Sequence, residues 1–266
     1  MEKVTVPSLK AMKSAGRRIA ALTCYDFTTA RLLNEAGIDL ILVGDSLGMV
    51  KLGYDSTLPV TVEDMVYHTR LVARGNSRAL LVTDMPYLSY HASPEEAVRN
   101  SGRMLKAGAQ AVKIEGGAEM APVLRALQTA KIPVLGHLGM TPQSIHQFGG
   151  FKVQGREAAA RRKLRRDAKT LERLGAFAVV LECIPEALGL SLSRALKIPT
   201  IGIGAGPHCD GQVIVADDML GFTPAPRPRF VKAYADLRGT ILKAARRYAE
   251  DVRARRFPDE AHSYHG

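Results

Sequence analysis

Five short apolar segments of this sequence each end at an acidic residue or a histidine. The end residues are Asp45 in ILVGDS, Asp84 in LLVTD, Glu115 in AVKIE, His137 in PVLGH and Glu182 in VVLE. A parallel strand that is buried on both faces is a nearly continuous run of Val, Ile and Leu, so the residue that ends it lies at the carboxyl edge of the sheet. Ligands of α/β proteins bind at that edge. These five residues are therefore the first candidates for a functional site.

Three of the five are carboxylates that follow successive apolar segments. Asp45, Asp84 and Glu115 would repel one another at one sheet edge unless a cation lay among them. Their oxygens suit Mg²⁺, which keeps several waters and leaves positions for substrate oxygens. Zinc is disfavoured, because His208 and Cys209 lie in a glycine-rich loop without a second His/Cys pair at zinc spacing. The alternative is that the three acids cap three helices independently.

Charged and apolar residues alternate in the segment AVKIE. The period of two of a strand puts Lys113 and Glu115 on one face, with Val112 and Ile114 on the other. The charged pair can then enter the interior of a barrel while the apolar pair packs on helices. A buried ion pair with a structural role is the alternative, because a buried charge needs a partner.

Glu182 and His137 each have a functional and a structural interpretation. Glu182 is a candidate general base, and the alternative is an N-cap contact with the helix that begins in IPEALG. His137 could hydrogen-bond a substrate oxygen or a ligand, although a single histidine at a strand end is more often structural. Cys183 follows Glu182 but points to the opposite face of the strand, which favours a small buried side chain over a nucleophile.

The rest of the sequence supplies the elements that would position these residues. Strands are predicted at residues 18–25, 39–45, 79–84, 111–115, 133–137, 177–182, 199–204 and 212–217. Helices are predicted from about residues 26, 61, 93, 118, 156, 185 and 230, with a short amphipathic helix near residue 8. The helices that follow Thr61 and Ser93 have capping boxes, since Asp64 and Glu96 stand three residues later.

Strands that alternate with helices form either a closed barrel or a doubly wound sheet. Eight strands in a chain of 266 residues favour closure, since (β/α)8 barrels typically need about 250 residues. We therefore expect an α/β protein, a (β/α)8 TIM barrel with a short N-terminal helix, forming a single domain over residues 1–266.

The formal net charge of +11 raises the question of nucleic acid binding. The basic residues concentrate in 156–175 and 241–256, where they alternate with Ala, Glu and Asp as on the solvated face of a helix. No zinc-finger or RNP-like pattern is present, so no nucleic acid partner is expected. A positive field would also collect an anionic small substrate.

The apolar runs and the cysteines bear on the cell compartment. The longest apolar runs are far shorter than the roughly 20 residues that span a bilayer, and the N-terminus lacks the apolar core of a signal peptide. The three cysteines form no CxxC pair, which fits reduced thiols. These features predict a cytoplasmic protein without a membrane partner.

Six longer stretches together resemble one known family. They are VGDSLGMVKLGYDSTLPVTVEDMVYHT (43–69), VKIEGG (112–117), GHLGMTPQSIHQFGGFKVQGR (136–156), LECIPE (181–186), IGIGAG (201–206) and FPDEAHSYH (257–265). The chain resembles the ketopantoate hydroxymethyltransferase family from Val4 to His265. The proline-rich segment 223–229 is the part least like that family.

The resemblance implies roles for the candidate residues. Asp45 and Asp84 would bind Mg²⁺ directly, and Glu115 would complete the metal site. Ser46 and Lys113 would bind the carboxylate or the developing enolate of a 2-oxo acid, with His137 as a supporting substrate-pocket residue. Glu182 would be the catalytic proton acceptor.

The resemblance also implies the reaction and the assembly. Family members transfer a hydroxymethyl group from 5,10-methylenetetrahydrofolate to 3-methyl-2-oxobutanoate in pantothenate and coenzyme A biosynthesis, and they assemble as homodecamers. The nearest alternative is the phosphoenolpyruvate mutase and isocitrate lyase group, which resembles the same architecture. A KKCGH-like loop of that group is absent from this sequence.

Overall fold

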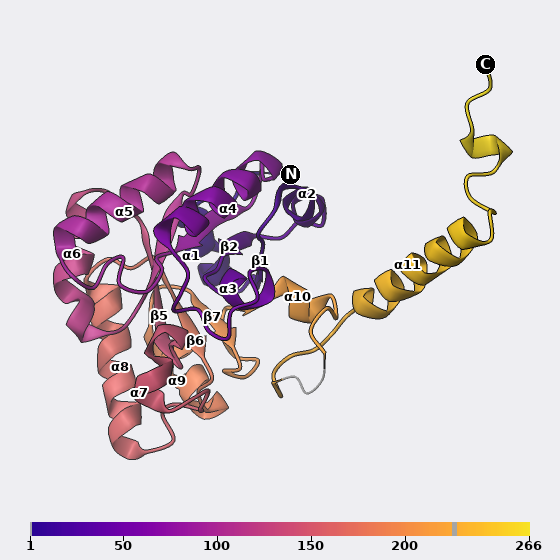
Figure 1. The fold of residues 1–266 in the computed structure, drawn as a ribbon. Coiled ribbons are helices and arrows are strands. Elements are labelled where there is room, and N and C mark those ends of the chain that lie inside the picture. The colour runs from indigo at the N-terminus through magenta and orange to yellow at the C-terminus, as the bar shows by residue number, and fades with distance from the viewer. Residues whose placement is uncertain (1, 225–227) are drawn as a thin grey trace. The chain divides into compact units, whose positions relative to one another are not determined.

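The computed structural model describes residues 2–224 and 228–266 and divides the chain into two compact units. The units are Met1–Val215 and Ala216–Gly266, and each is described by itself (Figure 1). The expected single domain over residues 1–266 stays a prediction. Part of the proline-rich segment 223–229, including Pro226, lies outside the described residues.

The first unit is a closed barrel of eight parallel strands that pair in sequence order. The strands are β1 Ile19–Thr23, β2 Leu40–Val43, β3 Leu80–Asp84, β4 Ala111–Glu115, β5 Val134–Gly139, β6 Ala178–Glu182, β7 Thr200–Ile203 and β8 Gly211–Ile214. In Figure 1 the helices α4, α5, α6 and α8 lie outside these strands. The predicted (β/α)8 TIM barrel is confirmed.

Helices follow most of the strands, and one precedes them. In the first unit they are α1 Val6–Ser14, α2 Phe27–Glu35, α3 Leu47–Val50, α4 Val62–Gly75, α5 Pro94–Lys106, η1 Ala118–Met120, α6 Ala121–Thr129, η2 Pro142–Ser144, α7 Ile145–Phe148, α8 Ala158–Arg173 and α9 Glu186–Ala195. The second unit contains α10 Ala216–Met219, α11 Leu237–Arg253 and η3 Glu260–His262. The predicted N-terminal helix is α1.

Side-chain caps fix the starts of the helices that lead away from the barrel mouth. At α4 the Thr61 hydroxyl accepts from the amide of Asp64, and the Asp64 carboxylate accepts from the amide of Thr61 at 2.9 Å, as predicted. At α5 the Ser93 hydroxyl accepts from the amide of Glu96 at 3.1 Å. Within the described residues Glu96 does not return that bond, so the second capping box is only half formed.

Apolar side chains fill the amino-terminal half of the barrel, and charged side chains fill the carboxyl half. Inward-facing residues alternate along a strand, so along β4 Ala111 precedes Lys113 and Glu115, and along β3 Val82 precedes Asp84. The apolar cluster comprises Val4, Leu9, Met12, Ile19, Ala21, Leu40, Leu42, Leu80, Val82, Ala111, Leu135, Phe177, Ala178, Val180, Ile201 and Val213. Because α1 contributes Leu9 and Met12, this helix packs against the amino-terminal end of the barrel.

The structure corrects two predicted boundaries in the C-terminal part of the chain. The eighth strand ends at Ile214 rather than at residue 217, because Ala216 begins α10. Asp217 and Asp218 stand in the first turn of that helix, where acidic residues are favourable. The last long helix begins at Leu237 rather than near residue 230, after Asp236 accepts a capping bond from the amide of Gly239.

No helix in the described ranges is both long enough and apolar enough to cross a membrane.

Candidate active site

The structure brings the predicted site residues together at the carboxyl edge of the barrel. Asp84, Glu115 and Glu182 are the last residues of β3, β4 and β6, His137 lies within β5, and Asp45 follows β2 by two residues. Asp45, Asp84, Glu115 and His137 are 2–4% exposed. The Glu182 side chain is 14% exposed. Glu182 is therefore the most open member of a buried polar cluster.

Asp84 connects three strands of the barrel. Its Oδ2 accepts a hydrogen bond from the backbone amide of Asp45 at 3.1 Å, and its Oδ1 lies 2.7 Å from Nζ of Lys113. Burial alone would lower the pKa of Lys113, but the charges of Asp84, Glu115 and Asp45 outweigh burial and raise it. The buried lysine is therefore an ammonium ion at neutral pH.

Asp45 occupies an unfavourable position for an anion. Burial, together with the charges of Asp84 and Glu115, raises the pKa of Asp45 well above its usual range, against the opposing effect of Lys113. Nε2 of Gln143 donates a hydrogen bond to Oδ2 of Asp45 at 2.8 Å, which stabilises the carboxylate. A nearby divalent cation would lower the pKa of Asp45 and so counteract the neighbouring carboxylates, which raise it.

His137 lies between two glutamates. Its Nδ1 is 3.3 Å from Oε1 of Glu115, and its Nε2 is 3.1 Å from Oε2 of Glu182. Burial and Lys113 oppose protonation of the imidazole, but the two glutamates raise the pKa of His137 to about 9. Burial likewise opposes ionisation of Glu115, yet His137, Lys113 and the amide of Gln143 hold the pKa of Glu115 below its usual value.

Ser46 lies beside the buried carboxylates. Its hydroxyl is 2.9 Å from the hydroxyl of Tyr25. A Cβ atom placed on Gly44 would lie 2.7 Å from the Ser46 hydroxyl and 3.6 Å from Oδ2 of Asp84. Both polar groups thus approach the backbone of Gly44, and glycine leaves the space that they occupy.

Gln143 and Tyr90 belong to the cluster but were missed by the sequence analysis. Gln143 donates from its backbone amide to Oε2 of Glu115 at 3.0 Å, and from Nε2 to Asp45 and to the carbonyl of Met85. The Tyr90 hydroxyl accepts from the amide of Glu115 at 3.0 Å and donates to Oε1 of Gln143 at 2.8 Å. These bonds connect the loops that follow β3 and β5.

Little in the sequence marks these two residues. Gln143 follows Pro142 in a stretch that carries the family resemblance, and η2 places it over the barrel mouth. Tyr90 is one of two tyrosines in the segment between β3 and α5. A neutral side chain in a loop gives no strand-end signal, so only the folded loops reveal its role.

Cys183 is a poor nucleophile in this structure. Burial and the adjacent charge of Glu182 raise the pKa of its thiol to about 11, so it is protonated at neutral pH. The thiolate is the reactive form of cysteine. The structure thus agrees with the sequence analysis, which did not assign Cys183 to the chemistry.

The residues of the cluster fit a divalent cation that is held by few carboxylates. Among the described residues no group of three or more His, Cys, Asp and Glu side chains is arranged as a metal centre. Asp45 and Asp84 are nevertheless adjacent hard oxygen donors, and Mg²⁺ binds proteins through one or two carboxylates. Within the same residues the buried Oδ1 of Asp84 and Oε1 of Glu115 have ionic neighbours but no aligned hydrogen bond.

Comparison with known sequences identifies the family. The sequence profile of ketopantoate hydroxymethyltransferase matches residues 3–260. This chain belongs to that family. It is 54% identical over 265 residues to 3-methyl-2-oxobutanoate hydroxymethyltransferase of Carboxydothermus hydrogenoformans, covering 99% of this chain and 96% of that protein. It is 53% identical over 254 residues to the protein of the same name from Geobacillus kaustophilus, covering 95% and 91%. The resemblance noted in the sequence is confirmed.

Comparison with solved structures concerns the fold alone. A phosphonopyruvate hydrolase in complex with oxalate and Mg²⁺ is 14% identical with a TM-score of 0.63, covering 97% of this chain and 93% of that chain. A 2,3-dimethylmalate lyase of the PEP mutase/isocitrate lyase superfamily is 16% identical with a TM-score of 0.60, covering 97% and 91%. The architecture that the sequence analysis named as the nearest alternative is thus shared, whereas the sequence relationship is to the hydroxymethyltransferases.

The Tyr90 hydroxyl generates a prediction about stability. Tyr90→Phe should lower the free energy of unfolding by about 1–3 kcal/mol, because the buried Gln143 Oε1 and the amide of Glu115 each lose a partner. Tyr67→Phe is the matched control, since Tyr67 is 60% exposed on α4. Urea unfolding at one protomer concentration measures both. Equal midpoints for the two variants would contradict the role given to Tyr90.

Proposed function

We propose that this chain transfers the one-carbon unit of 5,10-methylenetetrahydrofolate to 3-methyl-2-oxobutanoate as a hydroxymethyl group, with one water supplying the hydroxyl, giving ketopantoate and tetrahydrofolate for pantothenate and coenzyme A biosynthesis. The observation that carries the proposal is the identity of 53–54% over 95–99% of the chain to proteins named for this activity. The charged cluster at the barrel mouth supports it, because the reaction requires an enolate in a site that can both remove a proton and stabilise negative charge.

The proposed metal is Mg²⁺, held by Asp45 and Asp84. When bound, it would withdraw electron density from the keto oxygen and stabilise negative charge there as the C3 proton leaves. The two oxygens of Glu115 are engaged by His137 and the amide of Gln143. Glu115 would therefore complete the metal site with its negative charge rather than as a direct ligand. Phosphonopyruvate hydrolase, which has a similar fold, was crystallised with oxalate and Mg²⁺. Oxalate presents two adjacent oxygens, as a 2-oxo acid does.

Lys113 and Ser46 are the proposed binding groups for the substrate carboxylate or enolate oxygen. The Lys113 ammonium is fixed 2.7 Å from Asp84, so it provides positive charge without having to move into place. The Ser46 hydroxyl adjoins Asp45 and can donate to an oxygen held at the same position. Together they favour a substrate that carries its negative charge next to the keto group.

Glu182 is the proposed base, with His137 as its positioning partner. Oε2 of Glu182 lies 3.1 Å from Nε2 of His137, so a protonated His137 holds that oxygen and leaves the other carboxylate oxygen for the C3 proton. Glu182 is also more exposed than the other ionisable residues of the cluster, as a group that meets an entering substrate must be. His137 would thus hold the base Glu182 on one side and Glu115 on the other.

The loops around the barrel mouth offer apolar surface for the folate. Large apolar side chains that are 37–60% exposed occur after β2, β3 and β5. They are Met49, Leu52, Tyr54, Tyr87, Leu88, Phe151 and Val153. A flat pterin ring is bound well by such side chains. We propose that the folate enters over these loops and presents its one-carbon unit to the enolate. The homodecamer and the cytoplasmic location stay predictions.

A direct assay tests the reaction. The protein incubated with 3-methyl-2-oxobutanoate, 5,10-methylenetetrahydrofolate and Mg²⁺ should form ketopantoate, which mass spectrometry detects as the mass of the 2-oxo acid plus CH2O, because a hydroxymethyl group replaces the C3 hydrogen. Omission of the folate should abolish the product. The proposed reaction is wrong if the complete mixture yields no ketopantoate while the protein is folded. An unchanged rate in excess EDTA would instead contradict the proposed role of Mg²⁺.

Exchange of the C3 proton tests the base separately from the one-carbon transfer. In deuterated buffer with Mg²⁺ and without folate, the wild type should exchange this proton, and Glu182→Gln should lower the exchange rate by at least about 100-fold, the lower end of what a positioned base contributes. Glu186→Gln is the control, because Glu186 is an exposed acid at the start of α9. Wild-type exchange in Glu182→Gln, followed by NMR, would assign the base to another residue.

A further inference from the structure

A cavity lies at the amino-terminal edge of the barrel, opposite the carboxylates. Its volume is about 340 Å³. It is lined by the end of α1 and the residues before β1, by the end of α9, and by residues 208 and 210, which precede β8. Residues that precede parallel strands lie at the edge where those strands begin. The cavity is therefore separate from the proposed catalytic site.

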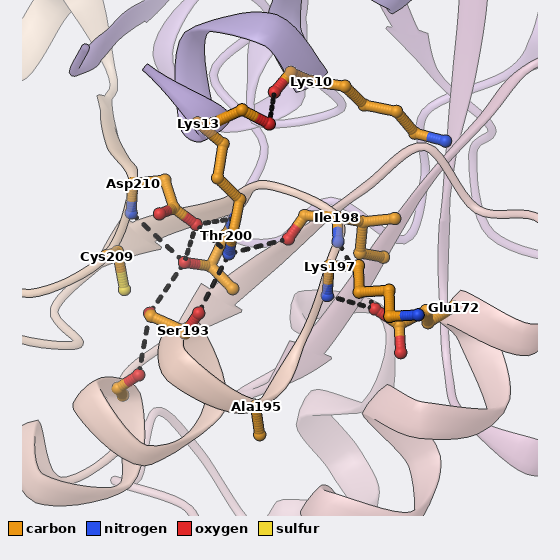
Figure 2. A network of polar contacts seen from close by, with 12 residues as sticks. Lys10, Lys13, Glu172, Ser193, Ala195, Lys197, Ile198, Thr200, Cys209 and Asp210 are labelled. Atoms are coloured by element: carbon orange, nitrogen blue, oxygen red, sulfur yellow. Dashed lines mark hydrogen bonds and ion pairs between the residues drawn. The ribbon is translucent and has the colours of Figure 1, made fainter. Parts of the chain in front are cut away.

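One ion pair in the wall of this cavity is internally satisfied. Nζ of Lys13 lies 2.7 Å from Oδ2 of Asp210 and donates to the carbonyls of Ser193 and Ile198. Asp210 also accepts from the amide and the hydroxyl of Thr200 at 2.8 and 2.9 Å. Figure 2 shows Lys13 reaching from α1 into this network. Lys13 and Asp210 thus neutralise each other and hold α1 against β7.

The remaining charged side chains that line the cavity are basic. Arg18 donates from Nη1 to the carbonyl of Cys209, which fixes its guanidinium group at the wall. Arg17 and Arg194 are exposed, and neither makes an ion pair within the described part of the chain. His208 is partly paired, since its Nε2 lies 3.1 Å from Oε1 of Glu186. The cavity therefore has an excess of positive charge.

A structural role explains only part of this arrangement. Basic side chains at helix C-termini are stabilising, and Lys13 has this role at the end of α9, where it binds the carbonyl of Ser193. Arg17 and Arg194 have no side-chain acceptor within the described residues. The N–H groups of both guanidinium groups therefore face solvent at the cavity wall, where a ligand could accept from them.

We propose that this cavity binds a small phosphorylated anion. Guanidinium groups pair with phosphate oxygens through two parallel hydrogen bonds, which is the geometry that Arg17, Arg18 and Arg194 can supply. The volume is that of a small-molecule site, larger than one phosphate group requires. A concave surface lined by one sign of charge also concentrates counter-ions. Carboxylates can pair with guanidinium groups in the same way, but three arginines beside a neutralised Lys13–Asp210 pair supply more positive charge than a single carboxylate would balance. The ligand class is therefore a phosphate ester or diphosphate, which carries two or more negative charges.

Calorimetric titration with inorganic pyrophosphate tests the proposal on the full chain. In 0.15 M NaCl, which screens exposed charges beyond about 8 Å, the wild type should bind pyrophosphate saturably. Arg17→Ala/Arg194→Ala should raise Kd by at least about tenfold, the equivalent of losing one strong charged contact. Arg162→Ala/Arg166→Ala removes the same charge from the exposed face of α8 and should change Kd by less than about twofold.

Two further ligands separate the possible sources of the phosphate group. Inorganic phosphate and ADP are titrated under the same conditions, and tighter binding of ADP than of pyrophosphate would indicate an organic ligand. Circular dichroism establishes that both double variants are folded. Equal loss of affinity in both double variants would show non-specific electrostatic attraction to the basic protein and would contradict a site at this cavity. The absence of saturable binding for all three ligands would likewise overturn the proposal.

Discussion

The burial of like charges at one edge of the barrel is the constraint on which the rest of this structure depends. Asp45, Asp84, Glu115 and Glu182 outnumber their cationic partners, Lys113 and protonated His137. Taking a carboxylate out of water is costly unless it is paired. The raised pKa of Asp45 is the sign that the protein's own groups leave this balance incomplete. A divalent cation and an anionic substrate would complete it.

The barrel makes such a cluster possible by separating apolar from charged layers. Each inward-facing position near the strand start is apolar, and α1 adds Leu9 and Met12 to that layer. Buried apolar residues on the outer faces of the strands, such as Ile41, Leu81 and Val112, add a second apolar layer beneath the helices. With both apolar layers present, the carboxyl half of the interior can hold charges that would destabilise a smaller core. Glycine is required where the walls approach closely: a Cβ on Gly139 would lie 2.1 Å from the carbonyl oxygen of Glu182.

The sequence predicted the strands and the charged residues at their ends because both follow from local pattern. A buried parallel strand has an unmistakable composition, and a charge at its end is visible at once. Gln143 and Tyr90 escaped this reasoning because they are neutral, lie in loops, and act through contacts between segments distant in sequence. The end of β8 and the start of α11 were misplaced for a related reason, since acidic residues and caps decide them more than apolar period does.

Fold and sequence relationships separate two kinds of conclusion about this protein. The same barrel occurs in phosphonopyruvate hydrolase and 2,3-dimethylmalate lyase at 14–16% identity, so the architecture alone does not select a reaction.

The most direct test of the central claim is anomalous diffraction from crystals that contain Mn²⁺ and 3-methyl-2-oxobutanoate. We predict one peak about 2.0–2.6 Å from carboxylate oxygens of both Asp45 and Asp84. Well-ordered density for the 2-oxo acid with no metal peak between these two residues would contradict the account.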